Sequence, residues 1–328
     1  MKLTRREFGG ATALFGLSFA LGACRKEQQE SAPRGPGGST SESRGLRIAA
    51  VSPALAITLR DLGLADRVVA RHAWDMVLDP KVPIVGDQSA IDYEALLATK
   101  PTHVMIEWGT RPVPERLTEM ATKHGWQTRS WSLLSYAQVR ASFQEIATFV
   151  AQGQPGGEGA RVAAAAVELT TRLDGACAQR ASAARAGKVL LLHSVAPPAA
   201  LGPGSFHHEI LERLGGRSAL TSGGAYAPLH MEDLLRLAPD SIVLIEPRAS
   251  ATSGGGDRPA SDTGWTQSEW PQMERKLGAI AALRIPAVQE RRVALIDDPL
   301  CLTPSSAMIG FAQELGELME RWALGRQG

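Results

Sequence analysis

The chain has 328 residues and a mass of 34.9 kDa, more than one small hydrophobic core holds, which predicts about two domains. With 44% hydrophobic, 21% charged and 5% aromatic residues, the composition excludes a disordered or fibrous protein. Lys and Arg number 35 against 34 Asp and Glu, so a formal net charge of +1 gives no reason to expect a nucleic acid as partner.

The N-terminus has the layout of an export signal. Basic residues that include Arg5 and Arg6 precede an uncharged stretch at residues 9–23, which is shorter than the ~20 residues that a membrane-spanning helix needs. The arginine pair resembles a twin-arginine export motif, and Leu-Gly-Ala-Cys ending at Cys24 resembles a bacterial lipobox, whose cysteine is lipidated. We therefore expect a lipoprotein signal peptide over residues 1–23, with an ordinary secretory signal as the alternative.

A flexible tether is expected next, because residues 24–45 are rich in Gln, Glu, Ser, Pro and Gly and have no apolar period. If Cys24 carries a lipid, Cys177 and Cys301 remain, and they show no C-x-x-C metal spacing. These two cysteines form either a disulfide or two buried thiols.

Strand and helix patterns alternate in the first lobe, residues 46–140. A β-type run at residues 46–51 leads into a helical pattern ending at Gly63. A second helical pattern begins at Asp92 and is broken by Lys100-Pro101 before a strand at residues 103–109. This alternation predicts a parallel sheet with helices on both faces.

The second lobe, residues 187–328, repeats the scheme after a connecting helix at residues 141–186. The helical signal runs from about residue 136 and is interrupted by a Gly-Gln-Pro-Gly-Gly run at residues 153–157. Strands are expected at residues 188–193, 241–246 and 293–297, and helices at residues 205–214 and 304–324.

An internal similarity links the two lobes. Residues 92–104 and 231–242 each contain an acidic helix, a proline and a buried strand. We therefore predict an α/β fold of two Rossmann-like lobes with parallel central sheets, joined by one long helix. The ligand cleft of such a fold lies between the lobes, where the carboxyl ends of the strands face each other.

Three features resemble the periplasmic binding proteins of ABC importers for iron-siderophores, haem and vitamin B12. They are the order of segments, the V-G-D-x-x-x-x-D-x-E-x-L-x-x-x-K-P-T-x-V run at residues 85–104, and the Gly-Pro-Gly-Ser turn at residues 202–205. The resemblance extends from Leu46 to the C-terminal helix. It implies an exported, membrane-tethered monomer that is not an enzyme, carries no cofactor, and delivers a metal chelate to a permease dimer with its ATPase. In that family one glutamate per lobe contacts arginines of the permease, and by position these are Glu94 and Glu232.

The ligand expected from this resemblance is a ferric siderophore, with haem or cobalamin as the alternative. Trp74 and Trp108 offer flat faces for a macrocycle or aromatic chelate. Siderophore binders of the family often place an arginine where this chain has Asp-Gln-Ser at residues 87–89. Arg111 is the candidate to take the role of that arginine. The expected ligand-binding residues are Ser52, His72, Trp74, Asp75, Gln88, Trp108, Arg111, His193, His207, Tyr226, His230 and Asp298.

Two other classes are less favoured. A Zn²⁺ or Mn²⁺ binding protein needs several converging ligands, but His207 and His208 are adjacent on a helix and no His-rich loop is present. For an exported hydrolase, the sequence has no G-x-S-x-G, H-E-x-x-H or G-x-x-x-x-G-K-[ST] motif. The Gly/Ser/Thr-rich insertion at residues 249–270 is expected to be a surface loop, with a lid as the alternative.

Overall fold

The structure, a computed structural model, describes residues 45–87, 89–152, 157–248 and 269–324. The expected signal peptide with Arg5 and Arg6, the tether with Cys24, the ligand candidate Gln88 and most of the insertion lie outside these residues. Residues 44–328 form one compact unit, to which the following description refers. Within the described ranges, no helix has the length and apolar character needed to cross a membrane.

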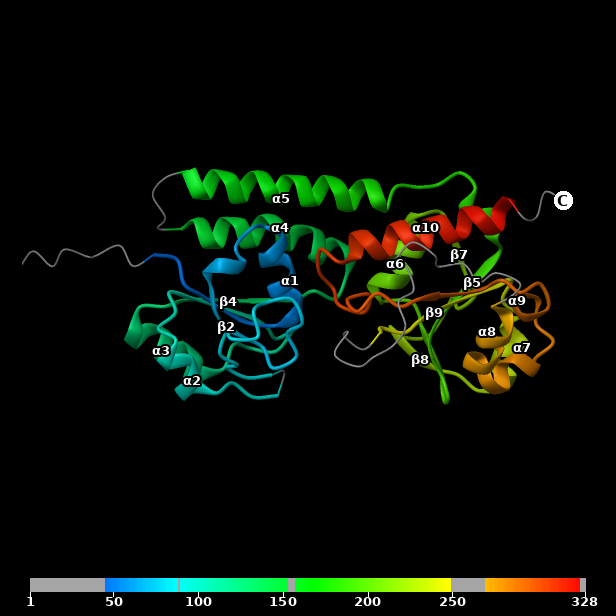
Figure 1. Cartoon of the computed structure of the whole chain (residues 1–328), viewed down its shortest axis with the longest axis horizontal. Helices are drawn as coiled ribbons and strands as arrows, with labels where there is room; N and C mark the ends of the chain where they lie inside the picture. The colour runs from blue at the N-terminus through cyan, green and yellow to red at the C-terminus, as the bar shows by residue number, and fades with distance from the viewer. Residues whose placement is uncertain (1–44, 88, 153–156, 249–268, 325–328) are drawn as a thin grey trace, which may run out of the picture. The chain divides into compact units, whose positions relative to one another are not determined.

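The first lobe is built on a four-stranded parallel sheet in the order β2-β1-β3-β4 (Figure 1). Successive side chains of a strand point to opposite faces, so Ile48 and Ala50 enter one core while Ala49 and Val51 enter another. The predicted alternation of strand and helix is confirmed. Its elements are β1 (Ile48–Val51), α1 (Pro53–Asp61), β2 (Val68–Arg71), α2 (Tyr93–Ala98), β3 (His103–Glu107), α3 (Glu115–His124) and β4 (Gln127–Trp131).

The second lobe contains a mixed sheet in the order β10-β9-β5-β6-β8, with β7 paired to β5. The prediction of a parallel sheet holds for β10, β9 and β5, but β6 and β8 pair antiparallel. Only Ala196 and Pro197 separate β5 from β6, and so short a connection permits only an antiparallel hairpin. The strands are β5 (Lys188–Val195), β6 (Pro198–Leu201), β7 (Arg217–Ser218), β8 (Tyr226–Pro228), β9 (Ser241–Ile245) and β10 (Val293–Ile296). The helices are α6 (Phe206–Arg213), α7 (Met231–Leu237), α8 (Trp270–Leu277), α9 (Pro286–Gln289) and α10 (Met308–Leu324).

The connection between the lobes consists of two described helices, α4 (Tyr136–Ala151) and α5 (Gly157–Ala176). A capping box starts α4: the Ser135 hydroxyl accepts the Gln138 N–H at 3.3 Å, and the Gln138 side chain accepts the Ser135 N–H at 3.2 Å. Helices α4, α5 and α10 lie together along one side of the two sheets (Figure 1).

One hydrophobic core extends through both lobes. It joins β1 of the first sheet to β5, β9 and β10 of the second through apolar side chains of α4, α5, α6 and α10, among them Phe143, Leu169, Leu211 and Leu315. The opposite face of each sheet has a core of its own, covered by α2 and α3 in the first lobe and by α7 and α8 in the second. The shared core therefore holds the two sheets in one layered unit.

Polar contacts also join the lobes. The backbone N–H of Tyr136, at the start of α4, donates to the Glu209 carboxylate of α6 at 2.7 Å. The Arg213 guanidinium lies 3.8 Å from the centroid of the Tyr136 ring. Farther along, the Ser306 hydroxyl donates to the Asp61 carboxylate at 2.6 Å.

The internal similarity of the sequence reappears in the backbone of α2 and α7. The residue just before the proline that follows each helix has a positive φ, 48° at Lys100 and 40° at Ala238. Steric crowding by the proline ring disfavours the right-handed helical region for the preceding residue, so both helices stop here. The strands β3 and β9 each start two residues after that proline.

Both described cysteines, Cys177 and Cys301, are free and buried. Burial raises the pKa of each thiol to about 12, so neither is ionised at neutral pH. Of the two alternatives for this pair, the structure therefore has the buried thiols.

Candidate functional site

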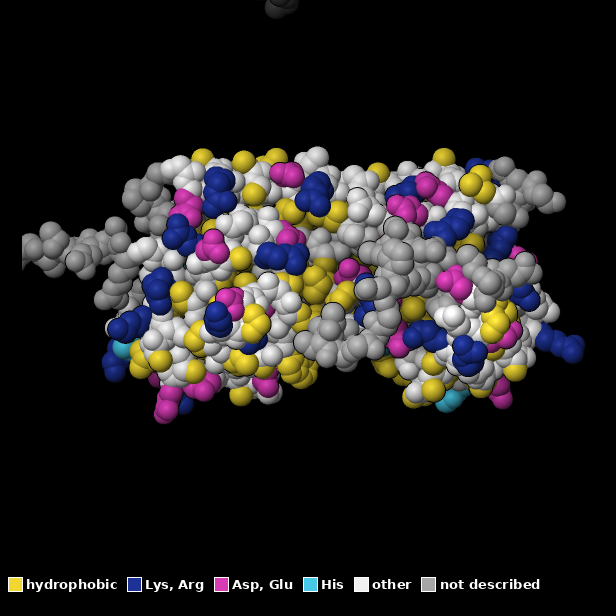
Figure 2. All heavy atoms as spheres, in the orientation of Figure 1, with side chains coloured by type: hydrophobic (Ala, Val, Ile, Leu, Met, Phe, Trp, Pro, Cys, Tyr) yellow, Lys and Arg dark blue, Asp and Glu magenta, His cyan; other side chains and the backbone are white. Residues whose placement is uncertain are grey.

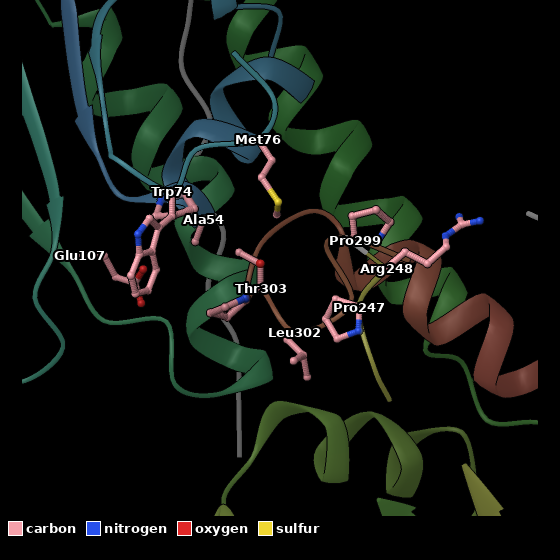
Figure 3. Close-up of a pocket in the computed structure, with 11 residues that line it drawn as sticks. Ala54, Trp74, Met76, Glu107, Pro247, Arg248, Pro299, Leu302 and Thr303 are labelled. Atoms are coloured by element: carbon pink, nitrogen blue, oxygen red, sulfur yellow. The ribbon is translucent and has the colours of Figure 1, made fainter. Parts of the chain in front are cut away.

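A pocket of about 590 Å³ opens between the lobes, at the carboxyl ends of their parallel strands (Figure 3). We call it the Trp74 pocket. Its residues follow or end β1, β2 and β3 in the first lobe and β9 and β10 in the second, which is where open α/β sheets bind ligands. It is lined by Pro53, Ala54, Trp74, Met76, Glu107, Pro247, Arg248, Pro299, Leu302, Thr303 and Pro304.

Two large apolar side chains of the Trp74 pocket are exposed to solvent. Trp74 is 67% exposed and Met76 is 49% exposed, although most large apolar side chains of the described chain are buried. Both sit on a loop after β2 that is held from within: the His72 imidazole accepts the Trp74 N–H at 3.0 Å, and the Asp75 carboxylate accepts the Val77 and Leu78 N–H groups. The loop therefore holds the Trp74 ring and the Met76 side chain at the wall of the pocket.

A second pocket, of about 410 Å³, adjoins the first and shares Leu302 and Pro304 with it. We call it the Tyr226 pocket. Its walls are mostly apolar, and the rings of His193 and Tyr226 meet edge to face at 6.0 Å. Tyr226 is 55% exposed. The lining comprises Leu133, Leu134, His193, Leu201, Gly204, Ser205, Phe206, His207, Ala225, Tyr226, Leu302 and Pro304.

His207 lines the Tyr226 pocket and is almost fully buried. Its Nε2 bonds the carbonyl of Cys301 at 2.8 Å, and because a carbonyl only accepts, Nε2 carries the proton. Burial lowers the pKa of His207 to about 4, so the ring is neutral at physiological pH. The ring thereby fixes the loop after β10, which supplies residues to both pockets.

Glu107 is a site residue that the sequence reasoning missed. It ends β3, is half-buried, and lines the Trp74 pocket. The Ser52 hydroxyl donates to its Oε2 at 2.8 Å, while the Ser52 oxygen accepts the Leu55 N–H as the cap of α1. Burial raises the pKa of Glu107 and outweighs the opposing effect of the Ser52 hydrogen bond. A carboxylate as the last residue of an otherwise buried strand is the sequence signal that would have found it.

The other predicted ligand residues divide into those at the cleft and those elsewhere. His72 and Ser52 are buried beside it, and Asp298 accepts the Leu300 N–H in the loop that carries Pro299. Nε2 of His72 and Nδ1 of His193 are buried without a hydrogen-bond partner among the described residues.

Trp108, Arg111 and His230 do not line either pocket. The Arg111 guanidinium lies 4.2 Å from the centroid of the Trp108 ring and covers one face of it. His230 lies at the start of α7, where its backbone N–H donates to the Asp233 carboxylate at 2.8 Å.

The predicted docking residues occupy matching places on the two lobes. Glu94 on α2 and Glu232 on α7 are both exposed. Three residues after each glutamate stands an exposed leucine, Leu97 at 41% and Leu235 at 48%. Residues three apart on a helix share a face, so each lobe presents one acid and one apolar side chain together.

Metal ligands do not cluster in the described part of the chain, where no three His, Cys, Asp or Glu side chains come close enough to hold an ion. The face in Figure 2 likewise intersperses basic and acidic side chains and has no large field of one sign. The site is therefore an apolar cleft with a few polar groups.

Comparison with known proteins agrees with this architecture. Residues 48–300 match the family model described as periplasmic binding protein, so the chain belongs to the periplasmic binding protein family. A search of curated proteins found no match. The resemblance drawn from residues 85–104 and 202–205 is thereby confirmed at the level of the family.

Solved structures of low sequence identity share the fold. The periplasmic haem-binding protein HutB of Vibrio cholerae is 20% identical with a TM-score of 0.60, over 83% of this chain and 98% of that one. The haem-binding protein RhuT from Roseiflexus sp. RS-1 in apo form is 16% identical with a TM-score of 0.58, over 85% and 99%. The vitamin B12 binding protein BtuF of Vibrio cholerae is 16% identical with a TM-score of 0.57, over 84% and 97%.

The buried His207 leads to a prediction about acid stability. Its pKa is about 4 in the folded protein and about 6.5 when unfolded, so between these values only the unfolded chain takes up the proton. We expect His207 to reduce the free energy of unfolding by up to about 1.4 kcal/mol for each pH unit of decrease in this window. Denaturant unfolding from pH 7 to pH 4 should show a shallower decline for His207→Gln than for the wild type. Parallel declines would contradict a neutral, buried ring.

Proposed function

We propose that this protein is the solute-binding component of an ABC importer, and that it captures a metal chelate between its lobes and delivers it to a permease. The observation that carries the proposal is the interlobe cleft, in which exposed Trp74, Met76 and Tyr226 surround two adjoining pockets. Exposing large apolar side chains to water is unfavourable unless a ligand covers them. The role involves binding and release without chemical conversion of the ligand.

A planar macrocyclic chelate, haem or a corrinoid, fits the cleft better than the ferric siderophore ranked first from the sequence. Among the described lining residues of the two pockets, Arg248 is the one arginine or lysine, and it lies 3.4 Å from Asp297. A highly anionic chelate calls for more cationic partners than this. Aromatic faces and a thioether suit a flat apolar ring, and Met, His and Tyr side chains are known ligands of haem iron. The similar structures include haem-binding and vitamin B12 binding proteins, which supports the same choice.

Direct titration tests the ligand class. Purified protein titrated in parallel with haemin, cobalamin, ferric siderophores and free Zn²⁺ or Mn²⁺ should bind one macrocyclic chelate saturably, as measured by calorimetry. Trp74→Ala should weaken that binding roughly tenfold through loss of ring contact. Val167→Ala removes an apolar side chain that is also exposed, at 59%, but lies on α5, and should leave affinity unchanged. A response to free metal alone, or to none of the probes, would reject the proposal.

For delivery, we propose that Glu94 and Glu232 contact arginines of a permease dimer, one from each lobe. This proposal is supported by the exposure of both glutamates at matching positions of α2 and α7, each with a leucine on the same helical face. These helices cover the sheet faces that are opposite to the shared core, so the two acid–leucine pairs are on the same side of the layered unit. A monomer suffices to present both pairs.

Charge reversal tests the docking role. Glu94→Arg combined with Glu232→Arg should abolish ligand uptake by cells while the affinity of the purified protein stays unchanged. Glu119→Arg with Glu168→Arg makes the same change at two other exposed glutamates and should leave uptake intact. Normal ligand uptake by the Glu94→Arg, Glu232→Arg variant, or loss of its ligand affinity, would contradict a docking role for these glutamates.

Export and tethering are proposed from the N-terminal sequence, which lies outside the described residues. Arg5 and Arg6 would direct export, and a lipid on Cys24 would hold the protein at the membrane surface from which it delivers ligand. Cys24→Ala should move the protein from the membrane to the soluble fraction when cells are fractionated. Persistence in the membrane fraction would argue against lipidation.

A further inference from the structure

The loop after β2 that carries Trp74 is held by three successive backbone N–H groups. The Ala73 N–H donates to the Gly86 carbonyl at 2.8 Å. The Asp75 N–H donates to the His72 carbonyl at 3.1 Å. Between them, the Trp74 N–H donates to a side chain, Nδ1 of His72, at 3.0 Å. The backbone conformation at Trp74 therefore depends on the His72 imidazole.

The environments of the two rings differ sharply. His72 directly follows β2 and is 1% exposed, whereas Trp74 is 67% exposed and lines the pocket (Figure 3). Their rings also meet edge to face, with 6.2 Å between the centroids and 78° between the planes. A buried ring is held in place by close packing, so its contacts restrict the motion of the exposed side chain beside it. His72 thereby links the packed interior of the first lobe to the wall of the Trp74 pocket.

The hydrogen bond to Trp74 requires the neutral form of His72. A backbone N–H only donates, so Nδ1 accepts, and the proton of the neutral ring is on Nε2. Burial lowers the pKa of His72 and outweighs the opposite effect of the Asp87 and Asp75 carboxylates, in agreement with this geometry. Nε2 is buried and has no hydrogen-bond partner among the described residues. A buried donor without a partner is unfavourable for folding, so stability alone does not account for a histidine here.

We infer that His72 is a positioning residue of the ligand site: its Nδ1 holds the backbone of Trp74, so that the indole ring is presented to the ligand in a fixed orientation. The inference rests on the proposed function and changes the role that the sequence predicted for His72, which was direct ligand contact. His72 is not among the residues that line the two pockets, in agreement with an action through Trp74. A side chain that is ordered before binding spares the ligand the cost of ordering it.

A double-mutant cycle on the full-length protein tests this role, with haemin, cobalamin and a ferric siderophore titrated in parallel. His72→Phe keeps a buried ring but removes the acceptor, and should weaken chelate binding roughly fivefold. His72→Asn places an accepting Oδ1 on the same carbon that carries Nδ1, and should bind within about twofold of the wild type. In the Trp74→Ala protein, His72→Phe should cause no further loss, because the ring that it positions is gone.

A matched control is available in the same lobe. His124, the last residue of α3, stacks on Trp126 with 5.3 Å between the ring centroids, and neither residue lines the two pockets. His124→Phe therefore changes another imidazole that lies against a tryptophan, and should bind the chelate as the wild type does. If His72→Phe does not fold, His72→Leu also lacks an acceptor and takes its place in the cycle.

The outcomes separate this inference from the proposed function. Unchanged affinity in His72→Phe, or an equal loss in His72→Asn, would overturn positioning by the hydrogen bond. A further loss when His72→Phe is added to Trp74→Ala would overturn an action through Trp74. In each of these cases the wild type still binds its chelate, so the importer function stands. Binding of none of the three chelates by the wild type would reject both.

Discussion

The burial of one continuous apolar layer between the two lobes is the constraint on which the rest of this structure depends. Side chains of β1, β5, β9 and β10 meet the same helical layer of α4, α5, α6 and α10, so neither sheet can turn away without exposing that layer to water. The cleft consequently keeps its two walls, and loops that start from different sheets face each other across it. A preformed cleft also spares a ligand the cost of ordering its site.

At the cleft, large apolar side chains are exposed and polar side chains are buried, the reverse of the usual distribution. Trp74, Met76 and Tyr226 are exposed there, while His207 and Ser52 are buried and hold the loops by hydrogen bonds. Buried polar groups thus hold the loops of the cleft in place, and exposed apolar side chains are positioned to contact a ligand. This is the arrangement of a small-molecule site. Glu107 departs from this division because it is an acid that reaches the pocket itself.

The sequence was a good guide to which loops form the site and a poorer guide to which side chains do. The prediction that ligand contacts follow strand ends placed Trp74, His193 and Tyr226 where the structure has pockets. The Trp108 ring instead packs under the Arg111 guanidinium, and His230 takes part in the start of α7. Met76, Glu107 and Leu302 were missed because a thioether, a strand-end acid and a loop leucine have no distinctive spacing in the sequence.

Local pattern by itself determined the alternation of strands and helices, the two similar lobes and the membership of a family. Periodicity of apolar residues and turn residues such as Lys100-Pro101 act over a few positions, so they can be read directly from the chain. Only the tertiary structure decided that the second sheet is mixed, that Cys177 and Cys301 stay apart as thiols, and that Glu107 shares a pocket with residues of the loop after β10. Each of these depends on contacts between segments far apart in sequence, and those contacts are set by how the layers pack.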